Sequence, residues 1–197
     1  MKRLDQMTLE ELWELFPISL VPHNPEWEVW GKEEIHILEG ILKDFSPLIS
    51  HIGSTAIPGI FAKPTVDILI EIPYSDEWQR IVGLLEQRGY LLMSRGERRM
   101  SFNKGYTPYG YADRVFHIHF HEIGDNDEIV FRDYLIKHPD VAHEYERLKL
   151  SLLPTYRNDR DGYTEAKTEF VINVVRTAKQ KSDFTSFGTD IGFEARY

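Results

Sequence analysis

Gly53, Ser54 and Thr55 lie between two apolar runs, about 48–52 and 65–72, which read as strands. Backbone N–H groups in such a turn can hold a phosphate, and the two hydroxyls can add hydrogen bonds. The alternative is a plain turn that needs glycine, and short Gly-Ser motifs are common enough to favour it when the motif is taken alone. We predict these residues, with the nearby cation Lys63, as candidate substrate-binding groups.

Asp67 lies inside the second run, which is otherwise apolar until Glu71. Burying a carboxylate costs free energy unless it is paired or binds a cation. Side chains alternate along a strand, so Asp67 and Glu71 share one face. Both are predicted as catalytic carboxylates. The alternatives are an Asp67 satisfied by loop amides or Lys63, and a Glu71 solvated at the strand end.

Three histidines alternate with apolar residues in the run His117-Ile118-His119-Phe120-His121. A strand places all three imidazoles on one face. Neutral imidazole is a common ligand of divalent cations. We predict a metal site formed by Asp67, His117 and His119, with His119 also catalytic. The alternative is a polar sheet face where the histidines only form hydrogen bonds.

Basic residues cluster in the stretch 95–104, and arginine suits bidentate contact with phosphate. Arg98 and Arg99 are predicted to bind substrate if this patch faces Gly53, and the alternative is a solvated hairpin. Three cations on later helices are expected to be ordinary surface residues, namely Arg132, Lys149 and Lys167.

Composition limits the classes of function. The chain has 197 residues, 42% of them hydrophobic, and a net charge of −9, which argues against broad binding to duplex nucleic acid or to anionic membranes. It has no cysteine and no apolar run of membrane-spanning length, and its N-terminus lacks the apolar core of a signal peptide. A cytoplasmic protein with a small-molecule partner is expected.

Apolar periodicity predicts helices that alternate irregularly with four or five strands. Helices are expected over about 8–16, 25–45, 76–88, 128–137, 139–152 and 163–179. Further strands are expected at about 90–93, 100–104 and 114–122, with a loop over 104–113 because of its glycine and proline content. The class is therefore α+β or mixed α/β.

Several motifs in order resemble the GrpB family, over about residues 20–180: HIGSTAIPGIFAKPTVDILIEI, HIHFHE, FRDYLIKHPDVAHEYERLK and GYTEAK, with VPHNPEW near the start. The resemblance implies an α+β fold of the nucleotidyltransferase-like superfamily, a mixed β-sheet flanked by helices. The family domain is therefore expected at 20–180, preceded by a helical extension at 1–19 and followed by a tail at 181–197, which lacks a clear period.

The superfamily signature is Gly-Ser, a gap, then two acids on one strand that hold Mg²⁺ for nucleotidyl transfer. Gly53, Ser54 and Asp67 match it, whereas Leu69 replaces the second acid. A pair of Mg²⁺ ions needs several oxygen ligands. The resemblance therefore implies either a modified site for a divalent metal (Mg²⁺ or Mn²⁺, or Zn²⁺), or a nucleotide- or phosphate-binding protein without catalysis. A histidine-rich metal protein of another reaction class is a further alternative.

Overall fold

Five strands form one mixed sheet in the order β1-β2-β5-β4-β3. The computed structural model describes residues 2–73 and 77–187. The central strands β2 and β5 run parallel, and the other neighbouring strands run antiparallel. The predicted α+β class, with a mixed sheet flanked by helices, is confirmed. The strands are β1 Leu48–Ile52, β2 Val66–Ile72, β3 Leu91–Arg95, β4 Arg99–Thr107 and β5 Gly110–Glu122.

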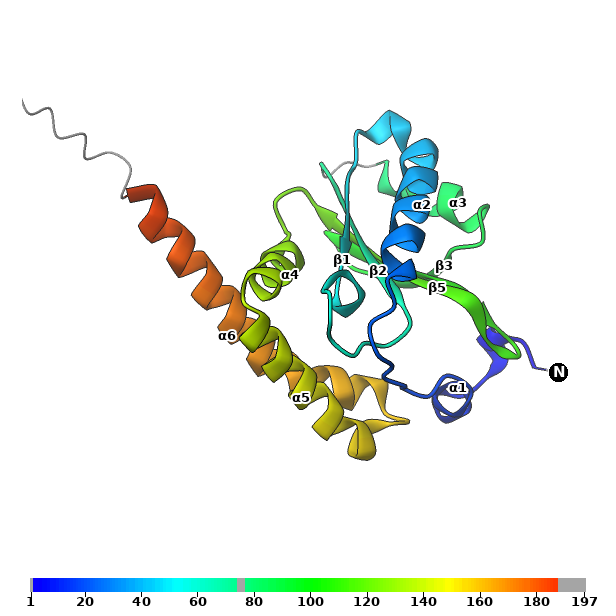
Figure 1. Cartoon of the computed structure of the whole chain (residues 1–197). Coiled ribbons are helices and arrows are strands. Elements are labelled where there is room, and N and C mark those ends of the chain that lie inside the picture. The colour runs from blue at the N-terminus through cyan, green and yellow to red at the C-terminus, as the bar shows by residue number, and fades with distance from the viewer. Residues whose placement is uncertain (1, 74–76, 188–197) are drawn as a thin grey trace, which may run out of the picture.

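Helices lie on both sides of the sheet (Figure 1). On one side are α2 Glu26–Ile41 and α3 Trp78–Glu86; on the other are α4 Asp127–Lys137, α5 Pro139–Tyr156 and α6 Arg160–Phe187. The short helix α1 Leu9–Leu15 lies apart from both layers, and 3₁₀ turns occupy Leu4–Gln6, Lys43–Phe45 and Ser54–Ala56. Within the described ranges, no helix is both long and apolar enough to cross a bilayer.

Strand alternation divides the sheet residues between two environments. The even-numbered residues of β2, with Ile118 and Phe120 of β5, are buried in the core against α2 and α3. The odd-numbered residues of β2 and β5 face the side of α4, α5 and α6, where a second, smaller apolar cluster contains Phe131 and Tyr145. Asp67 and the three histidines are odd-numbered, so the fold directs them away from the main core.

Helix boundaries follow local signals where the sequence supplies them. The side chain of Thr8 accepts a hydrogen bond from the Glu11 amide, and the Glu11 carboxylate accepts one from Thr8, which is the predicted capping box of α1. The Asn24 side chain accepts a bond from the Glu26 amide at the start of α2. The last helix runs to Phe187, so part of the predicted tail is helical, and residues 188–197 lie outside the described part.

The predicted loop over 104–113 was wrong. β4 continues to Thr107 and β5 begins at Gly110, so these residues form a hairpin. The Thr107 hydroxyl donates to the Gly110 carbonyl and closes the turn (2.8 Å). Tyr106 and Tyr111 pair across the strands, with ring centroids 5.3 Å apart. This cross-strand aromatic pair stabilises strand structure where glycine and proline alone predict a loop.

Candidate functional site

One row of side chains crosses all five strands, on the face of the sheet that carries Asp67. Strand register places Ile52 beside Asp67, Asp67 beside His117, His117 beside Asn103, and Asn103 beside Leu91. All five residues line one large cavity. The predicted proximity of Asp67 to the imidazole row is therefore confirmed, and it follows from the parallel pairing of β2 with β5.

The Asp67 carboxylate contacts two imidazoles through one oxygen. Its Oδ1 lies 3.3 Å from Nδ1 of His117 and 3.3 Å from Nε2 of His119. Burial by itself would raise the pKa of Asp67, but the hydrogen bonds from the two histidines outweigh it and hold the pKa well below its usual range. Asp67 is therefore a carboxylate, and it accepts from both rings.

A polar chain continues from His117 to α6. The Tyr106 hydroxyl lies 2.7 Å from Nε2 of His117, and the Arg160 guanidinium donates to the Tyr106 oxygen (2.8 Å). Since that oxygen accepts from Arg160, its proton is available to His117 Nε2, which then accepts while Nδ1 donates to Asp67. Burial lowers the pKa of His117, which fits this neutral form, and both ring nitrogens are engaged.

His119 differs from His117 in the direction of its pKa shift. Burial would lower the pKa of His119, but the hydrogen bond to Asp67 together with the negative charges of Asp67 and Glu128 outweighs burial and raises it. The His119 side chain is 36% exposed in the cavity wall, against 15% for His117. Of the two imidazoles that contact Asp67, His119 is thus the more exposed one, and its pKa is raised whereas that of His117 is lowered.

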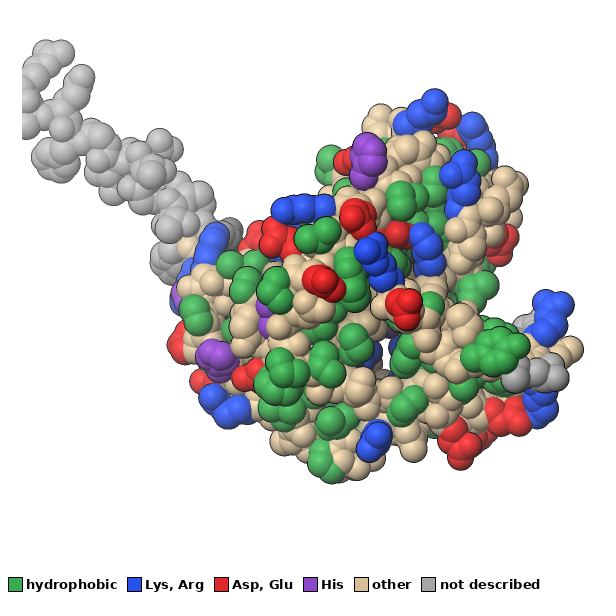
Figure 2. All heavy atoms as spheres, turned by 45° about the vertical axis from the view of Figure 1, so that its right-hand side comes forward, with side chains coloured by type: hydrophobic (Ala, Val, Ile, Leu, Met, Phe, Trp, Pro, Cys, Tyr) green, Lys and Arg blue, Asp and Glu red, His purple; other side chains and the backbone are tan. Residues whose placement is uncertain are grey.

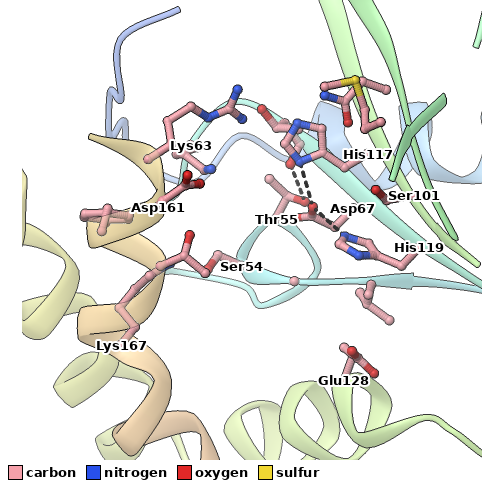
Figure 3. A pocket seen from close by; sticks show the side chains of 18 of the residues that line it. Ser54, Thr55, Lys63, Asp67, Ser101, His117, His119, Glu128, Asp161 and Lys167 are labelled. Atoms are coloured by element: carbon pink, nitrogen blue, oxygen red, sulfur yellow. Dashed lines mark hydrogen bonds and ion pairs between the residues drawn. The ribbon is translucent and has the colours of Figure 1, made fainter. Parts of the chain in front are cut away.

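Gly53 allows the turn to approach Asp67 closely. Its φ of +71° and ψ of −172° lie in a region that only glycine adopts readily. A Cβ at this position would lie 2.5 Å from Oδ2 of Asp67. The neighbouring Ser54 lines the cavity (Figure 3), whereas the hydroxyl of Thr55 is buried and donates to the Thr65 carbonyl (3.2 Å). Glycine is therefore required here by both conformation and space.

The turn is also tied to β1 through His51. Because the Thr55 hydroxyl donates to Thr65, it accepts from Nε2–H of His51 (2.9 Å). The ring also lies against Gly31 of α2, where a Cβ would come within 2.8 Å of its Nδ1. Burial, with a smaller contribution from Arg132, lowers the pKa of His51 to about 4 despite the charge of Asp67.

His51 should make the folded protein sensitive to acid. Its pKa is about 4 when folded and near 6.5 when unfolded, so the unfolded chain binds more protons between these values. Its contribution to stability is complete above pH 6.5 and falls as the pH drops towards 4, by about 3 kcal/mol. Urea unfolding of wild type and His51→Gln between pH 4.5 and 7.5 measures this. The free-energy difference between them should shift in favour of the variant at low pH, and a constant difference would contradict the assignment.

Glu71 and His121 pair with each other further along β2 and β5, and both support the turn that follows β5. The Glu71 carboxylate accepts from the Gly124 amide (2.9 Å) and from the Asn126 side chain (3.1 Å), while Nδ1 of His121 donates to the Asp125 carbonyl (2.8 Å). Both are buried, and neither lines the cavity. The structure therefore places Glu71 among the residues that shape the β5–α4 connection and away from Asp67.

The two predicted arginines also lie outside the cavity lining. Arg99 binds Asp125 through two hydrogen bonds, of 2.5 and 2.6 Å, and Arg98 binds Glu122 (2.7 Å). Arg99 pairs in register with His121, and not with a residue of the Asp67 row, and Arg98 precedes β4. The patch therefore does not face Gly53, which was the condition for its role.

The cavity is lined by cations other than the two predicted arginines. Lys63, Lys149, Arg160 and Lys167 line the cavity, and among the described residues none of the four has a carboxylate within 4.0 Å. Lys149 is buried and donates to the Phe61 carbonyl, and Lys167 lies 4.4 Å from the Tyr163 ring centroid. The expectation that Lys149 and Lys167 are ordinary surface cations was wrong. The third cation of that group, Arg132, donates to the His51 carbonyl (2.7 Å).

The four cations influence one another. Burial, then repulsion from Arg160, lowers the pKa of Lys63 to about 8. Burial, then repulsion from Lys167, lowers the pKa of Lys149 to about 7. Both shifts mark positive charge that is incompletely neutralised, in a chain whose net charge is −9. Figure 3 shows Lys63 and Lys167 around the same pocket as Ser54, Asp67 and the two histidines.

The cavity holds about 960 Å³ and has walls of different character. The space-filling view shows the surface hollowed beside the N-terminal helix, with basic atoms visible inside the opening (Figure 2). Polar residues come from the sheet, the 53–55 turn, α5 and α6, and the start of α4 adds the acids Asp127 and Glu128, whereas α1 and β3 contribute apolar side chains. This volume is at the upper end of the range for small-molecule sites, which also combine apolar walls with a few polar groups.

The donor set does not fit a pair of Mg²⁺ ions. The described residues contain no group of three histidine, aspartate or glutamate side chains placed to hold a metal. Asp67 already accepts from two imidazoles, both nitrogens of His117 are engaged, and Leu69 is fully buried where a second acid would lie. The predicted ligands Asp67, His117 and His119 are therefore together, but as a hydrogen-bonded cluster.

Sequence reasoning overlooked the contribution of α6. Most of its cavity-lining residues follow a helical spacing of three and four, namely Arg160, Tyr163, Thr164, Lys167, Thr168 and Val171; Asp161 and Ile172 line the cavity beside them. This face mixes charge with apolar groups, so apolar periodicity alone favours the neighbouring face that packs on α4 and α5. Two cations seven residues apart on one helical face were the available signal.

Comparison with known proteins places the chain in a family. The family model described as "GrpB protein" matches residues 17–177. A protein of Pseudomonas aeruginosa, "UPF0157 protein PA4798", is 36% identical over 164 residues, which cover 82% of this chain and 67% of that protein. "Glutamate-rich protein GrpB" of Alkalihalophilus pseudofirmus is 35% identical over 80% of this chain and 94% of its own length.

A solved structure agrees with the fold. The crystal structure of "conserved protein GrpB from Enterococcus faecalis" aligns with a TM-score of 0.72 and 26% identity, over 83% of this chain and 99% of that one. The aligned length agrees with the extent of the family match, which begins after α1. On this evidence, the chain belongs to the GrpB family.

Proposed function

We propose that this protein binds a nucleotide through its phosphate groups, at the basic part of the cavity, without a divalent metal. The observation that carries the proposal is the set Lys63, Arg160 and Lys167 around one cavity, with no carboxylate in ion-pair distance among the described residues. Charged groups removed from bulk water are costly unless they are paired, and an anion would supply the missing partner.

The chemistry of the three cations suits phosphate. Arg160 keeps donors on its planar guanidinium beyond the one used for Tyr106, and the two lysines act as mobile point charges. The hydroxyl of Ser54 lies in the same wall. The carboxylates of Asp67, Asp127, Glu128 and Asp161 also line the cavity, but among the described residues none of them lies within 4.0 Å of the three cations, so the phosphate is expected on the cation side of the cavity.

The absence of a second acid favours binding over nucleotidyl transfer. Transfer by two metal ions needs oxygen ligands around both cations. Here Leu69 is buried at the second position and Glu71 is bound to Gly124 and Asn126. Among the described residues, then, the site can attract and orient a phosphate, but it lacks the ligands that would activate one through Mg²⁺.

Calorimetric titration with ATP and with inorganic triphosphate tests the proposal, in EDTA and again with Mg²⁺. Micromolar binding in EDTA is expected, with no gain from Mg²⁺. The Arg99→Gln variant is a matched control, because Arg99 pairs with Asp125 outside the cavity and its loss should change affinity less than threefold. Binding that requires Mg²⁺, or that disappears in Arg99→Gln, would contradict the proposal.

The affinity should also depend on pH through Lys63. Its pKa is about 8 in the free protein, and a bound phosphate favours the protonated amine. The affinity for inorganic triphosphate should therefore be greatest below pH 8. It should fall by roughly tenfold, or about 1.4 kcal/mol, between pH 7.5 and 9.5, because Lys63 loses its positive charge over this range. In Lys63→Arg the cation stays charged, so the same titrations should give a flat profile. A fall of equal size in both proteins would show that Lys63 is not responsible.

A further inference from the structure

We infer that α1, which precedes the family-matched region, forms the wall against which the base of the bound nucleotide lies, with Trp13 as its main contact. This inference rests on the proposed function and extends it from the phosphate to the rest of the ligand. It explains an unusual feature of α1: the helix is amphipathic, yet none of the residues Leu9–Leu15 is buried.

The apolar face of α1 is directed into the cavity. Leu9, Leu12, Trp13 and Phe16 follow the spacing of one helical face, and all four line the cavity. Leu9 is 51% exposed, although an apolar helical stripe ordinarily packs on a core. A stripe that faces an open cavity gains little from burial until something apolar occupies that space.

The position of α1 is fixed at its C-terminal end. Phe16 is buried, with its ring centroid 4.7 Å from that of Tyr106 and 5.0 Å from that of Tyr111. The Tyr111 hydroxyl donates to the Phe16 carbonyl (3.3 Å), and the Ile18 amide donates to the Arg157 carbonyl (2.8 Å). The helix is therefore anchored to the β4–β5 hairpin and to the C-terminal end of α5, with its apolar side held over the cavity.

Tyr106 connects the two parts of the cavity. Its ring packs on Phe16, and its oxygen accepts from Arg160. A phosphate bound by Arg160 would therefore lie close to α1, with the Tyr106 ring between them. The apolar wall continues on β3, where Leu91 and Met93 are 42% and 57% exposed and line the same cavity.

The chemistry of this wall indicates a planar group. Indole and phenol rings stack on bases with little dependence on base identity, because every base has a π-face. A bare phosphate or a sugar phosphate would leave Trp13 and its neighbours exposed to water. The cavity as a whole thus matches a ligand with an anionic end and a flat apolar end, which a nucleotide has.

Trp13→Ala tests the inference in the full-length protein, by calorimetry with ATP and with inorganic triphosphate. The variant should lose about tenfold or more in affinity for ATP, as expected for one stacked base, and less than twofold for triphosphate. Trp13→Phe keeps a flat ring and should lose less than threefold for ATP. Tyr109→Ala removes an aromatic ring that is 82% exposed outside the cavity, and it should change neither affinity.

The outcomes distinguish a failure of this inference from a failure of the proposed nucleotide binding. If wild type binds neither ligand, both fail. If wild type binds both ligands and Trp13→Ala leaves the ATP affinity unchanged, or lowers both affinities equally, only the inference about α1 is overturned. Leu9→Ser provides a second variant at an exposed position, for which a selective loss of ATP affinity of about threefold is expected.

Discussion

Lys167→Glu should lower the affinity for inorganic triphosphate by at least 100-fold, or about 2.7 kcal/mol or more. The change removes one of the three cations proposed to bind phosphate and places a carboxylate beside Lys63 and Arg160, where it neutralises the positive charge that attracts the ligand. Affinity is measured by calorimetry at low ionic strength, because salt screens such interactions.

Lys137→Glu is the matched control for this charge reversal. It causes the same change in net charge, but Lys137 is exposed in the last turn of α4 and does not line the cavity. Its effect should stay below threefold. Equal losses in the two variants would show that the ligand responds to overall charge, and the basic cluster would then lose its special role.

Gly53→Ala should destabilise the protein by about 2–4 kcal/mol. The reason is the combination of a backbone conformation that only glycine adopts readily with a Cβ placed 2.5 Å from Asp67 Oδ2. The carboxylate would have to move, and its hydrogen bonds to His117 and His119 would lengthen. Urea unfolding measures the loss of stability, and NMR titration should show the pKa of His119 falling.

Gly59→Ala distinguishes backbone strain from the close contact with Asp67. Gly59 has φ of +81°, but no atom would lie within 4 Å of an added Cβ. It should cost about 1–2 kcal/mol from backbone strain alone and leave the pKa of His119 unchanged. If both variants behave alike, the close contact between Gly53 and Asp67 contributes nothing.

Part of this site followed from strand periodicity. Alternation put Asp67, His117 and His119 on one face, and the structure confirms that face because β2 and β5 pair in register. Gly53 was expected to serve a tight turn or a phosphate, and its conformation satisfies the first reading. These features depend on local geometry, which a sequence specifies directly.

The rest depended on contacts between distant elements. Register decides that Arg99 lies beside His121 and Asp125, and not beside Gly53, and no local pattern reports register. Lys149 looks like a surface cation on a helix, but the packing of α5 buries it against the Phe61 carbonyl. The role of Tyr106 required knowing that the predicted loop is a hairpin that meets both α1 and α6.

The central claim is that phosphate is held by cations and not by a metal at Asp67. A crystal structure of the protein with ATP and EDTA tests it most directly. The account predicts phosphate oxygens within hydrogen-bond distance of Lys63, Arg160 and Lys167, with Asp67 still bound to His117 and His119. ATP found elsewhere, or seen only when Mg²⁺ or Mn²⁺ is added and bridges it to Asp67, would contradict the claim.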